Sequence, residues 1–251
     1  MTKGYKNECD FEKTINNKKY CDLCDNLKGF IKFIFNDVKE EDVLKCRRYK
    51  SYDKADIYIE LNNNIKNISI KSGERVSVHA EMISSFTNFL EKIHFRKSII
   101  DSLLLYHYGD FTLDGSGKTR ISARELKEKY KKELIIMNNY FNHKNIIKKV
   151  ALRCLFEGVN KNNVADYIYY GNVHDGLYAS KEEIIDYFCN TKSDDIIAPH
   201  FSFLVYQNWD RNIIYNPKIE SHRYYCQFKW PSISRDLLKI REKWYDDLVY
   251  I

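Results

Sequence analysis

The chain has 251 residues, of which 44% are hydrophobic and 30% are charged, so it is a globular protein rather than a disordered one. It carries 41 Lys and Arg against 35 Asp and Glu, and the resulting net charge of +6 permits a polyanionic partner. No run approaches the roughly 18 apolar residues of a membrane-spanning helix, and the N-terminal segment lacks the apolar core of a signal peptide. We therefore expect a cytoplasmic protein that does not contact membranes.

The spacing of apolar residues alternates between helical and strand periods along the chain. The expected elements are a helix within residues 26–45, two strands and a helix over 54–93, a helical stretch from about 122 to 155, strands within 200–209 and 222–230, and a final helix from about 233. Ser122 and Glu125 have the spacing of a capping box, which marks the start of the long helical stretch. The mixture predicts an α/β (α+β) fold with a mixed sheet flanked by helices.

Residues 54–81, KADIYIELNNNIKNISIKSGERVSVHAE, predict a hairpin with one apolar and one polar face. Apolar and polar residues alternate in both strands, which is typical of half-buried strands, and the three asparagines supply a turn. The alternation places Asp56 and Lys71 on neighbouring strands, pointing the same way. Glu81 is expected in the first turn of the helix that follows, where it could point back over the sheet.

Two carboxylates and a lysine at the end of one hairpin can support hydrolysis of a phosphodiester. Carboxylate oxygens are ligands that Mg²⁺ prefers, and the bound metal both activates water and neutralises charge on a phosphate. A lysine beside them can stabilise the transition state. The structural alternative is a strand-end aspartate, a solvated edge lysine and a glutamate near a helix N-terminus.

The hairpin with Asp56, Ser69 and Lys71, followed by Glu81, resembles the PD-(D/E)xK nuclease superfamily, the fold of many restriction endonucleases. Ala55 stands in place of the usual proline and Ser69 in place of the usual acidic residue, so the pattern is similar to the variant with SxK and a glutamate supplied by the next helix. The resemblance implies that Asp56, Ser69, Lys71 and Glu81 are catalytic and that Asp56 and Glu81 bind the metal. Glu60 and Glu74 are further candidates for the second carboxylate.

The resemblance implies a restriction-endonuclease-like enzyme that hydrolyses DNA with Mg²⁺, or with Mn²⁺ in its place, and cuts both strands of a specific sequence as a homodimer. Residues 1–110 would form the nuclease core, and residues 111–251 a helical and β/α region for DNA binding or dimerisation. Two alternatives remain open at this point. The chain could be a nucleic-acid-binding protein that keeps the fold without the chemistry, or it could be an RNase.

A second hairpin in the C-terminal part is an alternative active site. Asp210 and Lys229, with Gln227 two residues before the lysine, form a QxK variant of the same pattern. Basic residues lie among aromatic ones here and in the turn DGSGKTR, which suits contact with phosphates and bases, although a solvated basic face would look the same. The candidate DNA-binding residues are Lys118, Arg120, Arg211, Lys218, Arg223 and Lys229.

Seven cysteines, an odd number, indicate a reducing compartment rather than a disulfide framework. Cys21 and Cys24 have the spacing of a zinc knuckle, and Cys9 and Cys46 are possible partners for a structural Zn²⁺ site. The alternative is that these four cysteines are free thiols.

Overall fold

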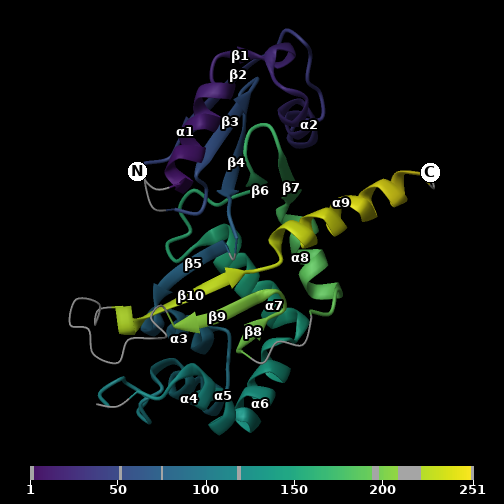
Figure 1. Ribbon diagram of the computed structural model, residues 1–251. Helices are drawn as coiled ribbons and strands as arrows, with labels where there is room; N and C mark the ends of the chain where they lie inside the picture. Colours follow the sequence, from purple (N-terminus) through teal and green to yellow (C-terminus); the bar gives the residue numbers. More distant parts are fainter. Residues whose placement is uncertain are drawn as a thin grey trace. The chain divides into compact units, whose positions relative to one another are not determined.

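The computed structural model describes residues 3–50, 53–74, 76–117, 120–193, 198–208 and 222–249 (Figure 1). The chain divides into two compact units, each built from separate stretches of sequence. Unit 1 comprises Met1–Val76, Leu152–Tyr187 and Ser232–Ile251, and unit 2 comprises Ser77–Ala151 and Phe188–Pro231. The division expected at residue 110 falls inside unit 2. Helices and strands are mixed in both units, which confirms the expected class, and no described helix is long and apolar enough to cross a membrane.

Unit 1 contains a six-stranded mixed sheet with the order β1-β2-β3-β4-β6-β7. The strands are β1 (Lys18–Lys19), β2 (Val43–Arg48), β3 (Ile57–Leu61), β4 (Asn64–Lys71), β6 (Tyr167–Gly171) and β7 (Gly176–Ser180). Strand β4 runs antiparallel to β3 and parallel to β6, so it lies inside the sheet. The helical elements are α1 (Lys3–Ile15), a 3-10 turn (Tyr20–Asp22), α2 (Asp25–Ile34), a π-helix (Leu152–Glu157), the first part of α8 (Lys181–Asn190) and α9 (Ile233–Val249).

The core of unit 1 forms where α1 and α2 pack on the sheet, as the purple helices in Figure 1 show. Phe11 and Phe30 come from the two helices and contact the ring of Tyr169 edge-on, at centroid distances of 4.8 and 4.9 Å. Ile57 and Ile68 supply the sheet side and are fully buried. Burial of one such side chain stabilises the fold by about 1.5–3 kcal/mol. Helix α1 was not expected within the largely polar residues 1–24, and it is anchored by the buried side chains of Phe11 and Ile15.

The β3–β4 hairpin has the geometry that the sequence predicts. Leu61 pairs with Asn64, so Asn62 and Asn63 form a two-residue turn. Their φ angles are 49° and 62°, and a twisted two-residue hairpin turn requires positive φ at both positions, which asparagine tolerates well. This register places Ile57 opposite Ile68 on the core side.

Unit 2 contains a four-stranded sheet with the order β5-β10-β9-β8. The strands are β5 (Val76–Met82), β8 (His200–Phe201), β9 (Leu204–Asn208) and β10 (Tyr225–Trp230). The helices are α3 (Ile83–Lys92), α4 (Lys97–Tyr108), α5 (Ala123–Lys129), α6 (Lys131–Phe141), α7 (Lys144–Ala151) and the end of α8. Aromatic side chains dominate the core: Phe141 stacks on Phe201 with centroids 4.2 Å apart, and Phe86 meets Phe228 edge-on.

Two expected helices differ from what the structure shows. The segment after the hairpin is a strand, β5, through Met82, and its helix begins only at Ile83. The long helical stretch is divided into α5, α6, α7 and the π-helix. Its predicted start is confirmed, because Ser122 Oγ accepts from the Glu125 N–H at 3.2 Å and Glu125 Oε2 accepts from the Ser122 N–H at 2.7 Å.

Candidate active site

Asp56 lies immediately before β3, and three donors fix one oxygen of its carboxylate. Oδ2 accepts from the backbone N–H of Ile70 at 2.6 Å, from Ser69 Oγ at 3.2 Å and from Lys71 Nζ at 3.2 Å. Oδ1 has no hydrogen-bond partner among the described residues, and the side chain is 21% exposed, so solvent reaches it. The carboxylate is therefore oriented by β4 through one oxygen, and its other oxygen remains open to a ligand.

Lys71 is the last residue of β4, and its ammonium group lies between two acceptors. Nζ is 3.2 Å from Asp56 Oδ2 and 3.1 Å from the carbonyl oxygen of Ile70. Its side chain is only 17% exposed, so water screens the pair with Asp56 less than it would a surface pair. The structure thus brings together Asp56, Ser69 and Lys71, which the sequence proposed as one site.

Glu8 of α1 adds a second carboxylate that the sequence did not indicate. Its pKa is raised, first by burial and then by the negative charge of Asp56, while the positive charges of Lys71 and Arg48 lower it. The charges of Asp56 and Lys71 thus act on Glu8, which places its carboxylate in the same part of unit 1. Phe11 and Ile15, one and two turns later, are the apolar signal from which this helix could have been found.

Glu81 does not have the position that the sequence predicts. It lies on strand β5 of unit 2 rather than in a helix, because α3 begins at Ile83. Its side chain is almost fully buried, with Oε1 2.9 Å from His79 Nε2 and Oε2 accepting from Ser85 Oγ at 2.7 Å. These contacts give Glu81 a stabilising role within unit 2.

The other carboxylates considered from the sequence are placed less favourably for a metal. Glu60 forms an ion pair with Lys45 at 2.8 Å on the sheet surface, and Glu74 is exposed after β4. In the described part of the chain, no three His, Cys, Asp or Glu side chains gather around one point. A magnesium ion keeps several waters and needs only one or two carboxylates, so Asp56 and Glu8 are the side chains that could hold one here.

A hollow of about 630 Å³ in unit 1 adjoins the end of β4. Ser72 and Gly73, directly after Lys71, line it together with parts of α1 and the β6–β7 hairpin. Tyr170 Oη donates to Gly73 O at 2.9 Å, and Asn7 Nδ2 donates to Gly171 O at 2.8 Å, so hydrogen bonds hold its walls. The hollow thus begins directly after Lys71 in the chain, but Lys71, Asp56 and Glu8 are not among its lining residues.

The four cysteines considered for zinc do not gather into one site. Cys24 Sγ donates to Val173 O at 3.2 Å, and Cys46 lies in the core. Burial raises the pKa of the Cys46 thiol to about 12, which opposes the thiolate form that zinc requires. Cys9 and Cys21 are partly exposed free thiols.

Three of the candidate DNA-binding residues, Lys118, Arg211 and Lys218, lie outside the described residues. Arg120 donates to the carbonyl oxygen of His107 at 2.8 Å. Arg223 is paired with Asp110, whose side chain is fully buried, and also donates to Gly117 O at 2.8 Å. The guanidinium group of Arg223 is therefore engaged inside unit 2.

Asp110 also explains the glycine-containing turn that the sequence contains. Its carboxylate accepts from the backbone N–H groups of Thr112 and Gly117, each at 3.0 Å. An aspartate of the protein thus binds backbone N–H groups that a phosphate would use in a nucleotide-binding loop.

The alternative hairpin with Asp210 and Lys229 gains no support from the register. Asp210 lies outside the described residues, in the connection between β9 and β10. Cys226 pairs with Asn208 beside that connection, whereas Lys229 pairs with Val205, three positions further along β10. The lysine is thus at the end of the hairpin away from the connection that contains Asp210, whereas Asp56 and Lys71 both lie at the open end of the β3–β4 hairpin. No family model and no curated protein sequence matches this chain.

Proposed function

We propose that unit 1 is a metal-dependent nuclease that hydrolyses phosphodiester bonds in DNA. The observation that carries this proposal is the contact between Lys71 Nζ and Asp56 Oδ2 at 3.2 Å, at the open end of the β3–β4 hairpin. Glu8 supports it, because burial and the negative charge of Asp56 raise the pKa of its carboxyl group, which places a second carboxylate in the same part of unit 1. A hard oxygen donor set beside a fixed lysine suits phosphate chemistry better than nucleophilic catalysis by a side chain.

Asp56 and Glu8 would hold Mg²⁺, or Mn²⁺ in its place. When bound, the metal supplies activation of water and neutralisation of charge on the phosphate. Ser69 and the Ile70 N–H hold Asp56 Oδ2, which leaves Oδ1 as the metal ligand. Lys71 stabilises the negative charge that develops on the phosphoryl oxygens, and such a fixed donor contributes about 10²–10³-fold to the rate.

The proposed enzyme acts in the cytoplasm as a homodimer and cuts both strands of a specific double-stranded sequence. Two features favour a polyanionic substrate and a reducing compartment. The net charge of +6 attracts a polyanion, and all seven cysteines are free thiols, as in a reducing compartment.

Incubation of the protein with supercoiled plasmid tests the proposal. We expect linear or nicked DNA with Mg²⁺ or Mn²⁺ and none with EDTA, and we expect Asp56→Asn to be inactive although it folds like the wild type. Plasmid that stays intact at every metal concentration while the protein still retards it in a gel would identify a binding protein without catalysis. Cleavage of structured RNA but not of DNA would identify an RNase.

A further inference from the structure

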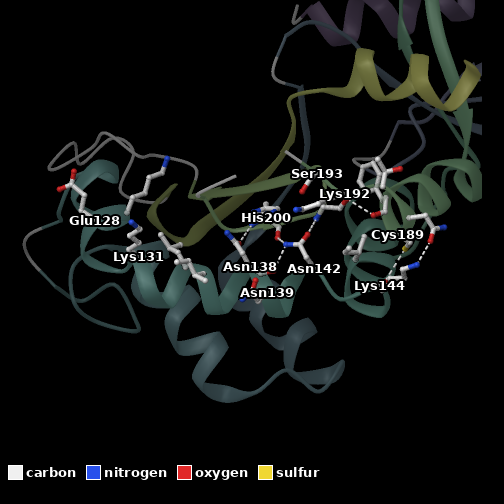
Figure 2. Close-up of a pocket in the computed structure, with 18 of the residues that line it drawn as sticks. Glu128, Lys131, Asn138, Asn139, Asn142, Lys144, Cys189, Lys192, Ser193 and His200 are labelled. Atoms are coloured by element: carbon white, nitrogen blue, oxygen red, sulfur yellow. Dashed lines mark hydrogen bonds between the residues drawn. The ribbon is translucent and has the colours of Figure 1, made fainter. Parts of the chain in front are cut away.

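Unit 2 contains a cavity of about 1180 Å³ that the proposed nuclease chemistry does not use. Helices α5, α6 and α7 form one side of it, and the end of α8 with the segment around His200 forms the other (Figure 2). Known small-molecule sites have about 300–1,000 Å³, so this cavity has room for a ligand of nucleotide size or larger.

Asn138 of α6 and Asn142, the residue directly after α6, build the wall that carries His200. Asn138 donates to Ala198 O and accepts from the His200 N–H, both at 3.1 Å. Asn142 donates to His200 O at 3.1 Å and accepts from the Ser202 N–H at 2.7 Å. Figure 2 shows these side chains side by side beneath the histidine. Because both ends of each amide are used, the backbone of residues 198–202 is held in a fixed position.

His200 presents a hydrogen-bond acceptor to the cavity. Its side chain belongs to a residue only 7% exposed, and Nδ1 lies 3.0 Å from Ala198 O, an atom that can only accept, so Nδ1 carries the proton. Burial lowers the pKa of the ring, which keeps it neutral. Nε2 is then an acceptor with no partner among the described residues, and it can accept from an N–H or O–H group of an occupant.

The cavity is also positively charged where it meets solvent. Lys127, Lys131 and Lys192 line it and have no carboxylate partner in the described part of the chain. Arg124, by contrast, is neutralised by Glu128 at 3.1 Å, and Lys144 donates to Asn190 Oδ1 at 2.7 Å. Three unpaired ammonium groups around one cavity favour an anionic ligand.

Apolar side chains complete the lining. Leu134, Ile135 and Ile147 belong to it, and Ile135, which is 53% exposed, offers surface for a flat ring. An occupant that matches all three features carries a phosphate for the lysines, a planar heterocycle for the apolar wall and a hydrogen-bond donor for His200.

We propose that this cavity binds a nucleoside phosphate, either as a free nucleotide or as a unit of a single nucleic-acid strand. The site is independent of the proposed nuclease activity, since every residue that forms it belongs to unit 2 and none belongs to the hairpin of unit 1.

Titration calorimetry on the full chain in EDTA tests the proposal, with ATP, AMP, inorganic phosphate and a single-stranded DNA oligonucleotide as probes. We expect saturable binding of ATP or of the oligonucleotide. ATP as the tighter probe indicates a free nucleotide, and the oligonucleotide as the tighter probe indicates a strand; both results support the proposal. Absence of binding by all nucleotide probes overturns it.

Two variants locate the site. Lys131→Glu should weaken nucleotide binding by about tenfold or more, whereas Lys148→Glu, an equal charge change on the exposed side of α7, should not. His200→Asn keeps a donor for Ala198 O but removes the Nε2 acceptor. It should weaken nucleotide binding about fivefold and leave phosphate binding unchanged. Equal effects of the two lysine variants, or an equal effect of His200→Asn on phosphate and nucleotide, would refute the assignment. Thermal unfolding of each variant checks that it folds.

Discussion

The backbone N–H of Ile70 donates to Oδ2 of Asp56 at 2.6 Å. This contact fixes the Asp56 side chain, directly before β3, through the main chain of β4, so substitution of the Ser69 or Lys71 side chain does not remove it. The orientation of Asp56 is therefore expected to survive the loss of either neighbour, Ser69 or Lys71. Variants at these two positions consequently report on chemistry rather than on the collapse of the site.

Lys71→Ala should reduce Mg²⁺-dependent cleavage by at least about 100-fold, because it removes the positive charge beside the reacting phosphate. DNA affinity without metal should stay near the wild-type value, since one partly buried lysine contributes little to duplex binding. Gel-based cleavage rates and fluorescence anisotropy measure the two quantities. Lys66→Ala, on the same strand, is the matched control, and equal cleavage by both variants would remove Lys71 from the mechanism.

Glu8→Gln should change the pH dependence of stability. A carboxyl group with a raised pKa binds its proton more tightly in the folded state, so the stability it contributes at low pH is lost as pH rises from about 4.3 through the raised value. Without divalent metal, the variant should therefore gain stability relative to the wild type across this window. Urea unfolding at several pH values measures the difference, and parallel curves would show that the pKa of Glu8 is not raised.

At pH values above that window, addition of Mg²⁺ should make the wild type more stable than Glu8→Gln. The metal binds the ionised carboxylate and stabilises the state that binds it, so the wild type should gain more stability than Glu8→Gln. The variant should also need more Mg²⁺ for half-maximal cleavage. If the Mg²⁺ concentration for half-maximal cleavage is unchanged, Glu8 does not bind the metal and Asp56 remains as the protein ligand.

Glu81→Gln separates the ligand role expected from the sequence from the stabilising role favoured by the structure. Loss of the buried charge that His79 and Ser85 contact should cost about 1–3 kcal/mol of stability. The Mg²⁺ concentration for half-maximal cleavage should stay at the wild-type value. Glu91→Gln, on the exposed side of α3, controls for charge. A raised metal requirement with normal stability would restore Glu81 as a metal ligand.

Arg223→Ala should destabilise the protein by about 1–3 kcal/mol, because it leaves the buried carboxylate of Asp110 without its cation. Arg124→Ala breaks a solvent-exposed pair with Glu128 and should cost roughly 0–1 kcal/mol. The salt dependence of DNA affinity should keep its slope in Arg223→Ala. If Arg223 contacts a phosphate instead, as its sequence context suggests, the slope becomes flatter by about one unit.

The β3–β4 hairpin could be predicted because its signals are local. Alternating isoleucines define the buried face, and Asn62 and Asn63 supply the turn within a few residues. Because these signals are local, the sequence also predicted correctly that Asp56 and Lys71 lie together. Helix α1 escaped prediction because only Phe11 and Ile15 mark its buried side, and the aromatic partner of Phe11, Tyr169, is more than 150 residues away in sequence. Glu8 was missed with it.

The prediction of a helix around Glu81 was wrong for a related reason. VHAEM satisfies both a helical and a strand pattern when read alone. Its strand conformation is decided by β10, which lies beside β5 in the sheet, and Cys226 of β10 donates to Glu81 O at 3.5 Å. A partner about 145 residues downstream decides the conformation here, and no local pattern encodes it.

The parallel pairing of β4 with β6 has a consequence for how the protein is made. Ile68 pairs with Tyr167 and Lys71 with Tyr170, so the strand that carries the lysine obtains its second neighbour about a hundred residues later. Contacts with such separation form slowly, because a long loop must close first. On the ribosome, the hairpin with Asp56 and Lys71 emerges early, but its sheet is completed only after residues 77–151 have been synthesised. Nascent chains that stop before residue 167 should therefore hold an exposed strand edge at β4 and depend on chaperones until β6 arrives.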